Sequence, residues 1–185
     1  MPRTSPSRVS PALAGGAVAT ALAAVALLAP AGQAAPAAAS SYLQFTKGTP
    51  THSRLTLFRD HRPVAEYRAG SGTSEQECER GRGWLPDGTY TLGRHHTAYD
   101  GNLVKGYAIE LGGKRCQDGT WRTELFIHSE MTRDGGRGGP ENQRWDGESD
   151  YTSHGCVKLR PQDIKRLYRA LDRDGWPTTL KVVHG

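Results

Sequence analysis

The residues of this chain whose types and spacing could do covalent chemistry lie near its C-terminal end, in Ser153-His154-Gly155-Cys156-Val157. A cysteine attacks as the thiolate, and it needs a neighbouring base or cation because a free thiol is mostly protonated near pH 7. His154 stands two residues before Cys156, and His128 ends the apolar run Leu125-Phe126-Ile127. Gly155 lets a main-chain amide approach a developing oxyanion closely. These residue types predict a cysteine acyl-transfer site.

Each of these residues also has a purely structural interpretation. Cys156 could be a buried, inert thiol, since free cysteine is among the most buried residue types. His128 could be a core histidine that ends a strand. The joint presence of a thiol, a base and a glycine favours the catalytic interpretation over both. The pattern does not decide whether His154 is structural or is itself the base.

Two further groups of residues suggest a metal site at first sight. His95-His96 are adjacent, and adjacent residues of an extended segment point to opposite faces. Asp146, Glu148 and Asp150 alternate as calcium ligands can, but the rest of the calcium-loop pattern is missing. Both groups are therefore predicted to be solvated loop residues, and no metal and no organic cofactor is expected.

The first 39 residues differ in composition from the rest of the chain. Arg3 and Arg8 are the only charges before an apolar stretch from about 12 to 29, and small residues follow between 34 and 39. This order is typical of a secretory signal peptide, which we favour over a membrane anchor because the stretch is rich in alanine. We expect residues 1–39 to be removed and 40–185 to form one domain, located outside the cytoplasm in the cell envelope or secreted, with no stable membrane insertion.

Charge and cysteine content restrict the partners and the redox state. Without Arg3 and Arg8 the formal charge falls from +5 to +3, and no basic run is present, so nucleic-acid binding is not expected. Three cysteines are an odd number for an oxidising compartment. Cys78 and Cys116 both lie in polar loop sequence, so we predict a Cys78–Cys116 disulfide that leaves Cys156 as the free thiol.

Beyond residue 40 the pattern is mainly that of strands and turns. We expect a hairpin from 54–58 and 64–69, a polar loop around Cys78, and strands at 89–92, 107–111, 121–128 and 178–183. A helix is expected from Pro161 to about Asp172, because apolar residues recur there at i, i+3, i+4 and i+7. The polar stretch from Ser129 to Tyr151 shows no periodicity, and its position between His128 and Cys156 suggests a lid.

Taken in order, these features resemble the L,D-transpeptidase catalytic domain, or YkuD, family. The resemblance rests on His128-Ser129, on Ser153-His154-Gly155-Cys156-Val157 and on Leu85-Pro86-Asp87-Gly88-Thr89-Tyr90, followed by the helix and the last strand. It covers most of residues 41–183. It implies a mainly β fold, a β-sandwich or barrel of mixed sheets with one C-terminal helix and a long active-site lid loop.

The resemblance also implies a reaction. Cys156 would attack a peptidoglycan tetrapeptide donor, release D-Ala and keep the tripeptide as a thioester. His128 would act as base, Ser129 would orient it, and the amides of Gly155 and Cys156 would form the oxyanion hole beside His154. A diaminopimelate amine acceptor would complete a 3→3 cross-link, and carbapenems are expected to acylate Cys156.

Four residues are expected to bind substrate. They are Ser153, Lys158, Tyr107 and Trp84; Trp84 lies among glycines and is expected to be exposed, where it suits contact with sugar or peptide. Tyr90 and Trp121 are expected to be packing residues, with the alternative that one of the three residues Tyr90, Tyr107 and Trp121 lines the donor groove. Lys158 stands where the family commonly has Arg or Asn, and lysine lacks the planar two-pronged donor of arginine.

The chain departs from the family pattern in the lid, which is longer than expected. The alternatives on the same fold are an L,D-carboxypeptidase, a wall-directed endopeptidase or a catalytically silent wall-binding module. The complete set of Cys, His and Gly residues argues against the silent module.

Overall fold

Strands make up most of the regular structure in the computed structural model, which describes residues 40–185. The strands are β1 (Ser41–Lys47), β2 (Ser53–Arg59), β3 (Arg62–Ser71), β4 (Gly88–Asp100), β5 (Lys105–Leu111), β6 (Lys114–Arg115), β7 (Trp121–Arg122), β8 (Leu125–His128), β9 (Val157–Leu159) and β10 (Thr179–His184). One α-helix, α1 (Pro161–Asp174), precedes β10, and two short 3₁₀ helices, η1 (Glu141–Gln143) and η2 (Ser149–Tyr151), lie in the lid. The predicted mainly β fold with a single α-helix is confirmed.

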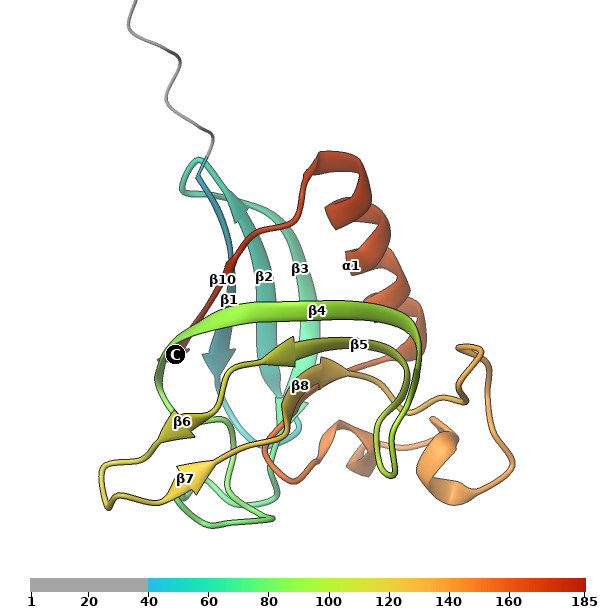
Figure 1. Ribbon diagram of the computed structural model, residues 1–185, viewed down its shortest axis with the longest axis horizontal. Helices are drawn as coiled ribbons and strands as arrows, with labels where there is room; N and C mark the ends of the chain where they lie inside the picture. Colours follow the sequence, from blue (N-terminus) through green and yellow to red (C-terminus); the bar gives the residue numbers. More distant parts are fainter. Residues whose placement is uncertain (1–39) are drawn as a thin grey trace, which may run out of the picture. The chain divides into compact units, whose positions relative to one another are not determined.

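Eight of these strands close into a barrel in the order β1-β10-β4-β5-β8-β9-β3-β2. The β1–β10 and β8–β9 pairs are parallel and the other pairs are antiparallel. In Figure 1, β4, β5 and β8 cross the direction of β1, β2 and β3 steeply. Alternate residues point inward, as Leu43 and Phe45 of β1 show, and both are completely buried. The barrel interior is therefore the apolar core.

The predicted helix is present and runs two residues further than expected, to Asp174. Pro161 suits the first turn, and the apolar face packs Ile164, Leu167, Tyr168 and Leu171 into the core. The Tyr168 hydroxyl lies 2.7 Å from the carbonyl oxygen of Ala108, which ties the helix to β5. Gly175, with a φ of 92°, ends the helix.

The adjacent histidines were wrongly assigned to a loop. They lie within β4, which is much longer than the segment 89–92 predicted from sequence because it pairs with both β10 and β5. The His95 ring stacks on Trp176 with 3.7 Å between centroids, and His96 Nε2 lies 2.9 Å from Glu110 Oε1. Both histidines therefore have structural contacts on the barrel.

The lid from Ser129 to Tyr151 is made of turns and the two 3₁₀ helices (Figure 1). Polar contacts tie it to the barrel. Arg68 of β3 pairs with Glu148 and lies over the Tyr151 ring, 4.2 Å from its centroid. Asp150 accepts hydrogen bonds from the amides of Asp146 and Gly147, both at 2.6 Å. Asp150 is buried, not solvated as expected, because its carboxylate organises this turn.

The predicted signal peptide lies outside the described residues, so the division at residue 39 stays a prediction. Within residues 40–185, α1 is neither long nor apolar enough to span a bilayer.

Candidate active site

Cys156 is the last residue of the turn Ser153–Cys156 and directly precedes strand β9. Its side chain is buried, and Sγ lies 3.6 Å from the carbonyl oxygen of Glu124, to which the thiol donates. Burial raises the pKa of the Cys156 thiol to about 11, although the Phe126 amide and the positive charges of Lys158 and Arg122 act in the opposite direction. The thiol is therefore protonated at neutral pH and needs a base in the reaction.

His128 ends strand β8 and is also buried. Its Nδ1 lies 3.0 Å from the carbonyl oxygen of Ser129, so Nδ1 carries the hydrogen and Nε2 keeps its lone pair. Burial lowers the pKa of His128 to about 3, and the positive charge of Lys158 lowers it further. At neutral pH the imidazole is uncharged and can accept a proton at Nε2.

The parallel pairing of β8 with β9 brings these two residues together from distant parts of the chain. Ile127 lies opposite Val157 and His128 opposite Lys158. His128 and Cys156 line the same cleft, whose volume is about 1000 Å³, together with His154, Glu124, Phe126 and Lys158. The cleft has space for a peptide substrate beside a thiol and a neutral base.

Ser129 orients His128 through its main chain and not through its side chain. The carbonyl oxygen holds Nδ1, whereas the buried Oγ has no hydrogen-bond partner among the described residues. The expected third member of the triad is therefore a peptide oxygen, and the residue type at 129 is less restricted than the sequence pattern suggests.

Ser153 organises the turn that presents Cys156. Its Oγ donates to the carbonyl oxygen of Cys156 at 2.7 Å and accepts from the amides of Gly155 and Gly72, both at 3.0 Å. A hydroxyl has one hydrogen and two lone pairs, so these contacts use its full capacity. Ser153 was predicted to bind substrate, but its hydroxyl makes all of its hydrogen bonds within the protein. Because the Gly155 amide points to Ser153, the Cys156 amide is the better oxyanion donor.

Lys158 lies in the cleft with its ammonium group paired to Glu130, and both side chains are largely buried. Nζ is also 5.9 Å from the centroid of the Trp145 ring in the lid. Burial raises the pKa of Glu130, an effect that Lys158 opposes. Lys158 thus joins β9 to the lid, and Glu130 compensates the charge that was expected to recognise the donor.

The aromatic residues of the cleft are not those predicted. Trp84 is 4% exposed, not exposed as expected, because Lys47 Nζ lies 4.9 Å from its ring centroid and the His184 ring packs against it at 5.7 Å. Tyr107 packs on Tyr168 of the helix at 4.8 Å. Neither residue lines the cleft.

Of the three residues Tyr90, Tyr107 and Trp121, it is Trp121 that lines the cleft, and it does not pack in the core because its side chain is 51% exposed. The exposed Leu103 lines the cleft as well. The sequence carries one signal for this exposure. Trp121 stands between Thr120 and Arg122, without the apolar alternation of a half-buried strand.

The three cysteines are not bonded to one another in the structure. However, Sγ of Cys78, Sγ of Cys116 and a carboxylate oxygen of Asp118 all lie within 4.8 Å of one another. Burial raises the pKa of Cys116 to about 12, and its contact with Cys78 acts in the same direction. The Cys78–Cys116 disulfide stays a prediction, and the two thiols are close enough for small side-chain movements to join them.

The family model of the L,D-transpeptidase catalytic domain, YkuD, matches residues 48–183. The chain belongs to this family. The match extends from the loop after β1 to the last strand and includes His128 and the turn at Cys156. The family model describes a catalytic domain, in agreement with a cleft that contains a thiol and a histidine.

Solved structures of two L,D-transpeptidases and of a cell shape determining protein are distantly similar to this chain. L,D-transpeptidase 1 of Mycobacterium tuberculosis is 14% identical with a TM-score of 0.46, covering 78% of this chain and 62% of that one. An L,D-transpeptidase of Mycobacterium smegmatis is 17% identical with a TM-score of 0.45, covering 78% and 58%. Pgp2, a helical cell shape determining protein of Campylobacter jejuni, is 16% identical with a TM-score of 0.45, covering 79% and 47%.

This chain therefore matches less than two thirds of the length of these proteins. A search of curated proteins found no match.

Proposed function

We propose that this protein is an exported cysteine L,D-transpeptidase that forms 3→3 cross-links between peptidoglycan stem peptides. The observation that carries the proposal is that one cleft holds a protonated thiol, Cys156, and a neutral imidazole, His128. A buried neutral base in the same cleft as a buried thiol suits proton transfer during attack and does not require a resting ion pair.

In the first half-reaction Cys156 Sγ attacks the carbonyl carbon between diaminopimelate and the terminal D-Ala of a tetrapeptide donor. The thiol proton passes to His128 Nε2 as the S–C bond forms. The main-chain amide of Cys156 stabilises the oxyanion. The C–N bond then breaks, D-Ala leaves with the proton from His128, and the tripeptide remains as a thioester.

In the second half-reaction a diaminopimelate amine of a neighbouring stem attacks the thioester carbonyl. His128 removes a proton from this amine and returns it to the Cys156 sulfur as the C–S bond breaks. The products are a 3→3 peptide bond and the free thiol. Water in place of the amine would give an L,D-carboxypeptidase, so access to the cleft under the lid decides the outcome.

One further observation supports the proposal. Residues 1–39 have the composition of an export signal, and peptidoglycan lies outside the cytoplasm.

The decisive experiment is mass spectrometry of the mature protein with a purified disaccharide-tetrapeptide, next to a Cys156→Ala control. We expect a Cys156-dependent dimer that is lighter than two monomers by one D-Ala. Tripeptide monomer alone would identify a carboxypeptidase. Unchanged tetrapeptide, together with no imipenem adduct on a free Cys156 thiol, would contradict the enzymatic proposal and favour a silent wall-binding module.

A further inference from the structure

Arg122 is a buried arginine whose charge has no carboxylate partner among residues 40–185. It ends the short strand β7 and is 3% exposed. Its guanidinium donates to four main-chain carbonyl oxygens: Nη1 to Glu77 and, at 3.4 Å, to Trp84, and Nη2 to Gly83 at 2.9 Å and to His154 at 3.0 Å. Burying a cation is costly unless its donors are satisfied, and here peptide dipoles satisfy them.

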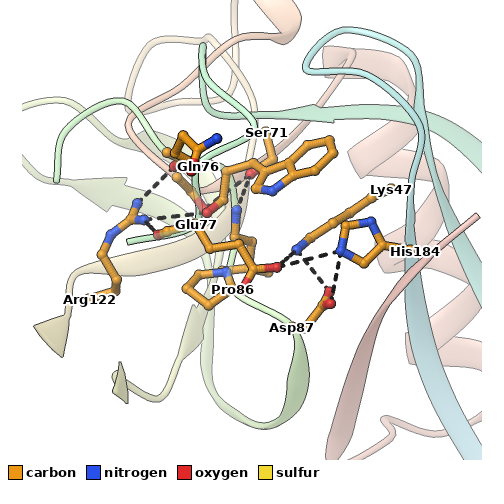
Figure 2. A network of polar contacts seen from close by, with 12 residues as sticks. Lys47, Ser71, Gln76, Glu77, Pro86, Asp87, Arg122 and His184 are labelled. Atoms are coloured by element: carbon orange, nitrogen blue, oxygen red, sulfur yellow. Dashed lines mark hydrogen bonds and ion pairs between the residues drawn. The ribbon is translucent and has the colours of Figure 1, made fainter. Parts of the chain in front are cut away.

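The four carbonyl groups belong to two separate segments. Three of them lie in the loop from Thr73 to Asp87, between β3 and β4, and the fourth belongs to His154 in the turn that presents Cys156. Figure 2 shows Arg122 approaching the segment of Gln76 and Glu77 from one side, while Lys47 lies on the other. Arg122 therefore joins the Thr73–Asp87 loop to the turn at Cys156.

Gly155 shows how closely the guanidinium packs on that turn. A Cβ atom at Gly155 would lie 2.1 Å from Arg122 Nη2, and the φ of Gly155 is +118°, which side chains rarely adopt. The glycine in the Ser-His-Gly-Cys motif is thus needed here for contact with Arg122 as well as for backbone conformation.

The charge of Arg122 also acts on the thiol. Together with Lys158, Arg122 lowers the pKa of Cys156 against the effect of burial. Lys158 is neutralised by its ion pair with Glu130, whereas Arg122 has no such counterion in the described part of the chain. A positive charge in a poorly solvated region favours the thiolate over the thiol.

We propose that Arg122 is a positioning residue of the active site: its guanidinium fixes the His154–Gly155–Cys156 peptide on the Thr73–Asp87 loop and places a buried cation, without a counterion in residues 40–185, against the turn that presents Cys156. The inference rests on the proposed role of Cys156 as nucleophile, but its first test needs no substrate.

The first test is the alkylation rate of Cys156 by iodoacetamide at pH 9, followed in the tryptic peptide 145–158. We compare wild type with Arg122→Met and Arg122→Lys, after circular dichroism shows that each is folded. We expect Arg122→Met to react at least about tenfold more slowly, which corresponds to a rise of one pKa unit in the thiol. Arg122→Lys keeps the charge and is expected to react within about twofold of wild type.

Lys47→Met is the matched control. Lys47 is a buried cation that holds the same loop through Glu77 and, at 2.8 Å, Asp87, but it has no contact with the turn at Cys156. We expect this variant to lose stability without changing the alkylation rate of Cys156. A wild-type alkylation rate in Arg122→Met, or an equal decrease in Lys47→Met, would overturn the electrostatic part of the proposal.

Turnover of Arg122→Lys tests the geometric part. Lysine cannot donate to all four carbonyl groups, so we expect at least about a tenfold loss of kcat with unchanged alkylation. If Arg122→Met does not fold, Arg122→Lys still tests the proposal. A wild-type kcat in Arg122→Lys would refute the positioning role of the guanidinium. If the wild type shows no transpeptidation, the proposed function is contradicted. The alkylation rates would still report the effect of Arg122 on Cys156, because that test needs no substrate.

Discussion

At the level of single residues, burial determines the chemistry of the two central side chains. Water is excluded from both His128 and Cys156, so each favours its uncharged form, the imidazole with a pKa of about 3 and the thiol with one of about 11. A cationic neighbour alone does not bring the thiol into the neutral range here. In the proposed reaction the proton therefore moves when substrate is bound, and the Ser129 carbonyl fixes which imidazole nitrogen would receive it.

The depressed pKa of His128 predicts acid sensitivity of the fold. In the unfolded chain a histidine binds a proton below about pH 6.5, but folded His128 does so only near pH 3. As the pH falls between these values the unfolded state binds more protons, so the free energy of unfolding decreases. By pH 4 the loss from this residue is about 3 kcal/mol.

His128→Gln removes this titration while keeping a neutral polar side chain. We expect the decrease in free energy of unfolding from pH 7 to pH 4, measured by urea denaturation, to be about 3 kcal/mol smaller in the variant. Between pH 7 and pH 9 His128 is uncharged in both states, so the difference between the two proteins should be constant there. Parallel stability curves between pH 4 and pH 7 would show that His128 is not held neutral.

Among the structural elements, the turn Ser153–Cys156 depends most on one side chain. Ser153→Ala removes three hydrogen bonds that hold this turn and join it to Gly72. We expect a loss of about 1–3 kcal/mol in stability, because buried amide and carbonyl groups lose a partner. We also expect at least about a tenfold slower acylation by imipenem, since Cys156 is displaced.

Ser53→Ala provides the comparison for this element. Ser53 is buried, accepts from the Gly48 amide at 3.1 Å and donates to the Thr49 carbonyl at 2.8 Å, in a turn outside the Cys156 cleft. It should lose stability without slower acylation, measured by the mass of the imipenem adduct. If Ser153→Ala is acylated at the wild-type rate, the serine does not position the nucleophile.

An element could be predicted well when the residues that determine it lie within one segment of the sequence. Helix α1 was predicted to within two residues because its capping proline, apolar face and terminal glycine lie in one segment. Strand β9 has only three residues and was missed, since it exists through its pairing with β8 and β3. Strand β4 was predicted too short for the same reason, because tertiary pairing outweighs the polar composition of its second half.

The candidate site follows the same rule. Cys156 and His128 were found from residue type and order, whereas Arg122, Glu130 and Glu124 matter through contacts with residues far away in the sequence. Trp84 was misassigned because glycine neighbours suggest exposure, while Lys47 and His184, which cover it, come from the two ends of the domain.

For the described domain as a whole, the core and the site are held together differently. The barrel and α1 share one apolar core, which supplies most of the stabilisation by burial. Apart from His128 on β8 and Lys158 on β9, the site lies in the connections 72–87, 112–124 and 129–156, which contain little regular structure. Polar anchors such as Arg122 and Arg68 fix these connections, so a variant of an anchor that contacts the turn at Cys156, such as Arg122, should change activity before it unfolds the barrel.

The predicted Cys78–Cys116 disulfide would add a covalent anchor to this arrangement. It would tie the Thr73–Asp87 loop to the β6–β7 hairpin that carries Arg122, and it would close a loop of about 38 residues (116 − 78). Loop closure of this length stabilises a domain by about 4 kcal/mol in the chain-entropy description. Because burial raises the pKa of Cys116 to about 12, Cys116 is a poor attacking thiolate, and we expect Cys78 to start the exchange.

Thiol counting and urea denaturation test this disulfide on protein exported to an oxidising compartment. The denatured, unreduced chain should contain one free thiol, which peptide mapping should assign to Cys156, and reduction should lower the free energy of unfolding by about 2–4 kcal/mol. A Cys78→Ser/Cys116→Ser double variant should equal the reduced wild type in stability and should not respond to reductant. Three free thiols in the exported protein would leave the loop held by Arg122 and Lys47 alone, and reductant would then have no effect on wild type.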